Sequence, residues 1–148
     1  SMTLSNYPQN VHINNLVIDA KVYATVIAIN NACVELSNAF IKLSNYRPDR
    51  ALIRIQSNRV LKNVVKFDRF RFVYDGEEKD VTANFFGVYP DNGYVILNGL
   101  CLEDAVIEGI TNYNLIGRSG SATNGYTIKN LVLNRVIASP LHKLDPNA

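Results

Sequence analysis

The amino-acid sequence predicts an all-β domain in which one supersecondary unit is stacked repeatedly into a coil. The apolar set is dominated by β-branched residues, with 28 Ile plus Val among the 148 residues, and such side chains favour strands. An asparagine flanked by alternating apolar residues also recurs, at intervals of 23, 25, 35 and 32 residues. Intervals of this size are expected when one unit repeats along a stack.

The clearest copy of the repeat surrounds Asn130. Tyr126 and Ile128 precede this asparagine, and Leu131 and Leu133 follow it, so that all four side chains are expected to point inward. Weaker copies surround four other asparagines: Asn15, Asn38, Asn63 and Asn98. Each copy predicts two short strands hinged at the Asn, which tolerates the left-handed backbone conformation. Stacked copies would align the five asparagines into a ladder of side-chain amides.

Residues 26–43 also fit a helix. Their apolar residues are spaced by three or four positions, which is typical of an amphipathic helix; they are Val26, Ile29, Cys33, Leu36, Phe40 and Leu43. We favour strands here, because Asn30 and Asn31 interrupt the window and because it contains the Asn38 repeat.

The repeats define the expected domain boundaries. Residues 1–10 are expected to be a tag remnant and lead-in, since the chain opens with Ser1-Met2, and residues 11–139 the coil. Residues 140–148, which contain Pro140 and Pro146, are expected to form a C-terminal tail. Polar insertions predict loops at 45–50, 74–80, 89–93 and 117–125.

The distribution of charge limits the possible partners. Eight basic residues and two acids lie between Arg47 and Arg71, whereas eight acids and one lysine lie between Asp75 and Glu108. A basic layer beside an acidic layer is typical of solvated faces, or of a groove for an anionic polymer. Nucleic acid is an unlikely partner, because the phenylalanines of the basic stretch are expected to face the core of alternating strands; they are Phe67, Phe70 and Phe72.

The sequence contains no signature of a cofactor or metal site. Cys33 and Cys101 lack metal-ligand spacing and are expected to be buried thiols. His12 and His142 have no carboxylate or cysteine neighbours of the kind that zinc sites use. No phosphate-binding glycine loop and no apolar run long enough to span a membrane is present. We therefore expect no cofactor, no metal and no membrane span.

The repeated pattern of apolar residues around Asn resembles the coils of right-handed parallel β-helix proteins. This pectate-lyase-like class includes bacteriophage tailspikes. The resemblance implies a single-stranded right-handed parallel β-helix of about five coils, a homotrimer, and an extracellular or virion-surface location. It also implies a polysaccharide partner. The run Arg47-Pro48-Asp49-Arg50 is similar to the two-arginine motif of pectate lyases, but its spacing is shorter.

Two kinds of candidate site follow. Glycoside hydrolysis uses paired carboxylates, and the acids close together in sequence are Glu103, Asp104 and Glu108. Carbohydrate binding requires aromatic faces for sugar rings and polar groups for hydroxyls. Tyrosines beside such groups occur on two predicted loops, which contain Tyr46, Arg47 and Arg50, and Tyr89, Asp91, Asn92 and Tyr94.

Three functions remain open from the sequence. The first is a phage-tail or surface-protein module that binds bacterial cell-surface polysaccharide. The second is a glycoside hydrolase or polysaccharide lyase that uses the surface carboxylates, and the third is a purely structural trimeric shaft.

Overall fold

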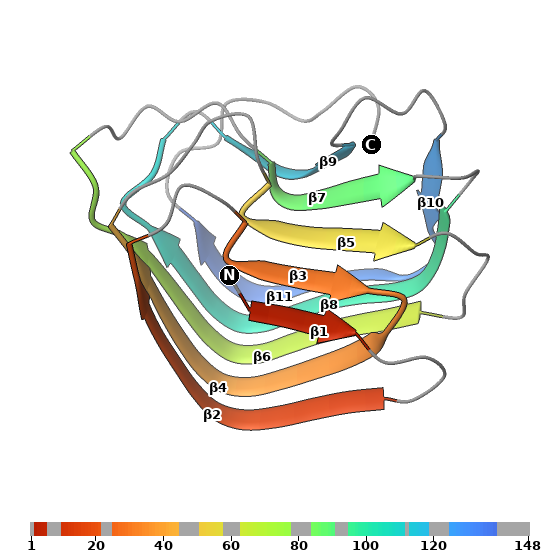
Figure 1. The fold of residues 1–148 in the computed structure, drawn as a ribbon, viewed down its shortest axis with the longest axis horizontal. Helices are drawn as coiled ribbons and strands as arrows, with labels where there is room; N and C mark the ends of the chain where they lie inside the picture. The colour runs from red at the N-terminus through yellow and green to blue at the C-terminus, as the bar shows by residue number, and fades with distance from the viewer. Residues whose placement is uncertain are drawn as a thin grey trace.

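The computed structural model of the chain consists of strands and connecting turns (Figure 1). It describes residues 2–5, 10–21, 25–44, 51–57, 63–77, 84–90, 95–111, 113–118 and 125–138. The predicted all-β class is therefore confirmed within these ranges. None of the described residues belongs to a helix long and apolar enough to cross a membrane.

Two parallel sheets contain all of these strands. Sheet A has the order β1 (Met2–Ser5), β3 (Ile27–Asn30), β5 (Ile53–Ser57), β7 (Asn84–Pro90) and β9 (Asn114–Arg118). Sheet B has the order β2 (Asn10–Ala20), β4 (Cys33–Leu43), β6 (Asn63–Tyr74), β8 (Val95–Glu108) and β10 (Tyr126–Ile128), and β11 (Leu131–Ala138) also pairs with β8. The chain thus alternates between the sheets, and β10 and β11 together lie along the single strand β8.

Residues 26–43 form strands, so the helical alternative for this window is wrong. β3 and β4 lie in different sheets and are separated by a turn at Asn31, whose φ of 52° is left-handed. A helix would have buried one stripe of this segment. The two strands instead direct alternate residues into the core: Ile27 and Ile29 on β3, and Val34 and Leu36 on β4.

Each long strand of sheet B bends at one residue with positive φ (Figure 1). We call these residues the bend row: Asn15, Asn38, Arg69, Asp104 and Arg135, with φ between 48° and 62°. The registers align all five, since Asn14 pairs with Ser37 and Leu16 with Ala39, and the same offsets hold on the following strands. The predicted hinge role of asparagine is therefore confirmed for Asn15 and Asn38.

The predicted single ladder of five asparagines is wrong. Asn63 pairs with Leu97, at the start of the strands, where a register shift follows. Asn130 lies at the same end, and its Nδ2 donates a hydrogen bond to the backbone oxygen of Asn98 at 2.7 Å. The error arises because side chains alternate with period two along a strand. The same apolar pattern therefore surrounds an asparagine at the bend of a strand and an asparagine at its start.

The core lies between the two sheets and is aromatic at its centre. Its rings have centroid separations of 5.0–6.1 Å and are at most 1% exposed; they belong to Phe67, Phe70, Phe72, Phe85 and Phe86. The prediction that the first three face the core is confirmed. Such rings bury a large apolar area each and so contribute strongly to the stability of the core.

The last rung of sheet B is less covered. Leu131 and Leu133 of β11 are 49% and 47% exposed, although they continue the inward rows of β8. Within the described residues no strand pairs with the far side of β11. The predicted inward direction of these leucines is thus confirmed by register, whereas full burial is not reached.

Candidate functional site

The outer face of sheet B carries polar side chains in rows that run across the strands. Alternation points every second residue outward, and the parallel registers align equal positions. His12 of β2 therefore lies beside Glu35 of β4, which lies beside Lys66 of β6, which in turn lies beside Cys101 of β8. Neighbouring strands are about 4.8 Å apart, so these groups can contact one ligand together.

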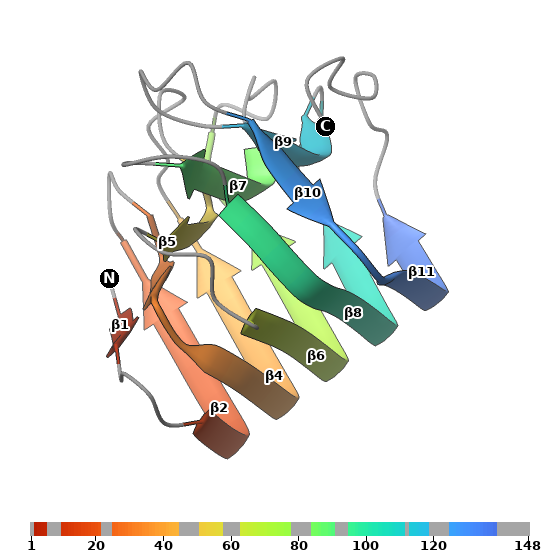
Figure 2. The same cartoon turned by 90° about the vertical axis from the view of Figure 1, so that its right-hand side faces the viewer.

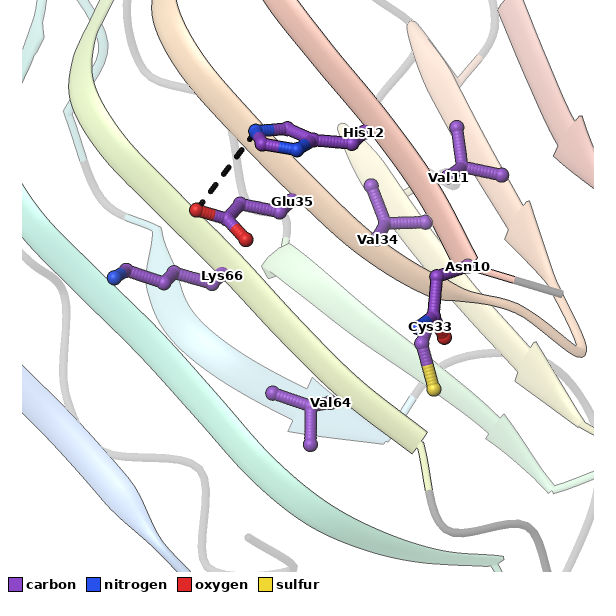
Figure 3. Close-up of a pocket in the computed structure, with 8 residues that line it drawn as sticks. All are labelled: Asn10, Val11, His12, Cys33, Val34, Glu35, Val64 and Lys66. Carbon is purple, nitrogen blue, oxygen red and sulfur yellow. Dashed lines mark ion pairs between the residues drawn. The ribbon is translucent and has the colours of Figure 1, made fainter.

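A pocket of about 320 Å³ lies at the start of these strands (Figure 3). Its volume is within the range of small-molecule sites, roughly 300–1,000 Å³. Figure 3 shows the side chains of His12, Glu35 and Lys66 in one row, with Asn10 and Cys33 together at the other end. The remaining lining residues are three valines: Val11, Val34 and Val64.

The polar rim of this pocket contains both hydrogen-bond donors and acceptors. His12 Nε2 lies 3.9 Å from Glu35 Oε1, and both side chains are well exposed, at 64% and 44%. Lys66 can only donate hydrogen bonds, the Glu35 carboxylate can only accept them, and Asn10 can do both. A phosphate would need donors alone and would be repelled by Glu35. A polyhydroxylated ligand uses donors and acceptors alike, and its C–H faces suit the exposed side chain of Val64; the Val34 side chain is buried in the core.

The candidate catalytic carboxylates all lie on β8 but do not converge. Glu108 accepts hydrogen bonds from Nε and Nη2 of Arg71, at 2.9 and 2.5 Å. Asp104 lies in the bend row and accepts two hydrogen bonds from Arg135. Glu103 and Glu108 are separated by five residues, or about 16 Å along the strand. The carboxyl groups of glycosidases are about 5–9.5 Å apart.

One pair of carboxylates was not predicted from the sequence. Asp68 of β6 and Glu103 of β8 are register partners on the outer face of sheet B, about 4.8 Å apart at their backbones. Asp68 also forms an ion pair with Arg69, at 3.4 Å. The repeat interval in the sequence indicates this pair. Asp68 and Glu103 are 35 residues apart, which is also the interval between the repeat asparagines Asn63 and Asn98.

Cys101 lies beside this pair of carboxylates and is half-buried. Its thiol donates to Glu103 Oε1 at 3.4 Å. Burial raises the pKa of the Cys101 thiol, and the hydrogen bond and negative charge of Glu103 raise this pKa further, while Lys66 opposes them. The expectation of two buried thiols is wrong, since Cys33 and Cys101 are both partly exposed, on outward positions of their strands.

The predicted carbohydrate-binding tyrosines are only partly described. Tyr46, Arg47 and Arg50, and likewise Asp91, Asn92 and Tyr94, lie outside the described residues, as does the Arg-Pro-Asp-Arg run at 47–50. Tyr89 is described and half-buried at the end of β7, in sheet A. The Arg54 guanidinium lies 5.7 Å from the centre of its ring. Gln56 of β5 lies in register with Tyr89, and Asn30 of β3 lies in register with Gln56.

The described residues contain no group of three or more His, Cys, Asp or Glu side chains that could hold a metal ion. Comparison of the chain with protein-family models, with curated proteins and with solved structures found no match. The function is therefore inferred from the geometry of the sheets and of the pocket.

Proposed function

We propose that this chain is a right-handed parallel β-helix of five coils that binds bacterial cell-surface polysaccharide. In this proposal each coil contributes one strand to sheet A and one rung to sheet B. The protein acts at the surface of a virion or outside the cell, as a module of a phage tail or surface protein. The alternation of the chain between two parallel sheets supports the fold.

The pocket on the outer face of sheet B is the main support for the functional proposal. It combines an exposed imidazole, a carboxylate and an ammonium group in successive strands with the exposed apolar side chain of Val64. Saccharides present hydroxyl groups that both donate and accept, together with apolar C–H faces. The mixed rim also argues against nucleic acid, because Glu35 would face the phosphates.

Binding is tested by titrating capsular and O-antigen oligosaccharides into the protein and measuring heat or fluorescence. For a saccharide that binds, Lys66→Ala should weaken the affinity about tenfold, since hydrogen bonds to charged groups contribute about 1.5–3 kcal/mol. Lys129→Ala is the matched control, because Lys129 is an exposed lysine that does not line the pocket. Equal affinities for the two variants would contradict the assignment of the pocket.

Tyr89 provides a second arm of the same experiment. If the saccharide binds instead at Tyr89 of sheet A, whose ring lies 5.7 Å from the Arg54 guanidinium, Tyr89→Ala weakens binding and Lys66→Ala does not. If neither variant changes binding, or if no polysaccharide of the panel binds at all, the shaft function is supported and the proposal fails.

The register pairing of Asp68 with Glu103 favours glycoside hydrolysis as the second candidate function. A backbone separation of about 4.8 Å suits the closely spaced carboxyl groups of retaining enzymes. Incubation with the same polysaccharides should then release reducing ends, and Glu103→Gln should abolish the release while binding persists. Retention of the polysaccharide without any cleavage supports the binding module alone.

A further inference from the structure

The outer face of sheet B around the saccharide pocket carries more negative than positive charge. Figure 2 shows β2, β4, β6 and β8 side by side and pointing the same way, so equal positions of these strands form rows across the sheet. The row that contains His12, Glu35 and Lys66 has one carboxylate and one ammonium group. The next row contains the register partners Asp68 and Glu103, which add two carboxylates.

The arginines that follow Lys66 on β6 are paired with acids of the chain itself. Arg69 Nε lies 3.4 Å from Asp68 Oδ2, and Arg71 donates hydrogen bonds to Glu108 at 2.9 and 2.5 Å. The basic stretch of the sequence therefore does not form, on this strand, the open positive surface that attracts an anionic polymer. With the Asp68–Arg69 pair counted as neutral, the two rows still hold two carboxylates against the ammonium group of Lys66.

Glu35 is the carboxylate that a bound ligand meets first, because it lines the pocket between His12 and Lys66 (Figure 3). Its side chain is 44% exposed. Glu103 lies on the strand beyond Lys66 and two residues further along, which separates the two backbones by about 8 Å. This is less than the screening length of about 10 Å at 0.1 M salt. A negative charge bound at Lys66 would therefore be repelled from both sides.

The thiol of Cys101, beside Lys66 in the same row, responds to the same charges. Its pKa is raised mainly by burial, and next by the hydrogen bond and the charge of Glu103. The charge of Lys66 lowers this pKa by less than the charge of Glu103 raises it. At this position of the face, a neutral group is thus favoured over an anion even with an ammonium group alongside.

We propose that the ligand of this pocket is a neutral saccharide, and that Glu35 rejects saccharides that carry negatively charged groups. This ligand class rests on the proposed saccharide binding. Glu35 would accept hydrogen bonds from sugar hydroxyls, whereas an ionised sugar carboxylate beside it has no proton to donate. Lys66 would donate to sugar oxygens, and the 43% exposed side chain of Val64 would contact a C–H face. Specificity of this kind depends on a repulsive element as well as on attractive contacts.

Carboxyl reduction of acidic oligosaccharides tests the ligand class. Oligosaccharides from uronate-containing capsules are compared with the same molecules after carbodiimide activation and borohydride reduction, which converts each carboxylate into a primary alcohol. Binding is measured by calorimetry at about 20 mM and about 150 mM salt. At low salt the reduced form should bind about fivefold more tightly, which is the effect of one close pair of like charges in water, and salt should narrow the difference. An acidic form that binds as tightly as the reduced form, or more tightly, overturns the proposal.

Glu35→Gln tests whether this residue causes the rejection. Gln keeps an oxygen that accepts hydrogen bonds but has no charge. The affinity for the acidic form should therefore rise about fivefold, and the affinity for the reduced form should change much less. Asp19→Asn is the matched control, because it removes the same charge from an exposed position of β2, seven residues beyond His12 and outside the pocket. Equal effects of the two variants on the acidic form overturn the role of Glu35.

Saccharide binding and neutral specificity can fail separately. If the acidic and reduced forms bind equally and Lys66→Ala weakens both, saccharide binding in the pocket stands and the neutral ligand class is wrong. If neither form of any oligosaccharide binds, the proposed function itself fails, and the ligand class fails with it.

Discussion

Arg135 and Asp104 are register neighbours on β11 and β8, and both have left-handed backbone conformations. Nε of Arg135 donates to one carboxylate oxygen of Asp104, and Nη2 donates to the other at 3.0 Å. The pair therefore links the last rung of sheet B to the stack at the bend row. The Arg135 hydrogen bond holds the pKa of the Asp104 carboxyl below its usual range.

Acid should weaken this link. A carboxyl whose pKa is lowered by folding stabilises the native state above its unfolded pKa, about 3.9 for Asp, and this contribution is lost as the pH falls through the folded value. Asp104→Asn keeps a residue that tolerates the left-handed conformation. We expect a lower melting temperature for this variant at neutral pH, and a difference from wild type that vanishes in acid.

Salt provides the control for the Asp104 experiment. Both side chains are exposed to solvent, at 61% for Arg135 and 40% for Asp104, so added salt should reduce the difference between wild type and Asp104→Asn. A difference that is constant across pH and salt would indicate a cause other than the ion pair.

Substitutions in the bend row should destabilise the protein to different extents, according to how well the new residue tolerates a left-handed backbone conformation. Asn38 has a φ of 55°, and its Nδ2 donates to Asn14 Oδ1 at 2.8 Å. Asn38→Gly loses this hydrogen bond but relaxes the backbone, whereas Asn38→Val places a β-branched residue in a conformation that it rarely adopts. We expect Val to reduce the free energy of unfolding by about 1–3 kcal/mol more than Gly does, measured by urea denaturation. Equal losses would show that the side-chain hydrogen bond dominates.

The aromatic core should be the most sensitive part of the chain. Phe85 is fully buried, and its ring contacts those of Phe70, Phe72 and Phe86. Phe85→Ala should reduce the free energy of unfolding by about 3–5 kcal/mol, which is a large part of the stability of an ordinary domain. Phe85→Leu keeps most of the volume and should lose less. A loss below about 1 kcal/mol for Phe85→Ala would contradict this packing.

The sequence predicted strand class and inward residues well, because alternation and β-branched content are local properties. The expectation that Phe67, Phe70 and Phe72 face the core is confirmed, but Phe67 and Phe72 are five residues apart, and it is the bend at Arg69 that brings both to the inner face. Strand register, in contrast, depends on residues that are distant in the sequence. The asparagines at 63, 98 and 130 have the same flanking pattern as Asn15 and Asn38, but they lie at the start of the strands and not at the bend. Arg69, Asp104 and Arg135 adopt the hinge conformation without being asparagine.

The candidate pocket depended on that same non-local information. His12, Glu35 and Lys66 are 23 and 31 residues apart, and only the strand registers bring them together. In the sequence alone His12 is an isolated residue for this reason. Glu103 likewise lies near Glu108 along the chain, whereas its neighbour across the sheet is Asp68.

The reactivity of Cys101 tests whether these cross-strand neighbours are correct. Burial and Glu103 raise the pKa of the Cys101 thiol, and Lys66 lowers it. The thiolate is the nucleophile, so below the pKa the alkylation rate follows the thiolate fraction. In a Cys33→Ser background, Glu103→Gln should lower the pKa and accelerate alkylation by iodoacetamide severalfold, whereas Lys66→Met should slow it. Mass spectrometry gives both rates as a function of pH.

The two variants should converge with wild type at high pH, where the thiol is ionised in every case. Glu35→Gln is the control, because Glu35 lies two strands away, beyond Lys66 in the same row, and should change the rate much less. If Glu103→Gln and Glu35→Gln had the same effect, simple loss of one negative charge from the face would explain both. If Lys66→Met left the rate unchanged, Lys66 and Cys101 would not be neighbours, and the row that defines the candidate pocket would be wrong.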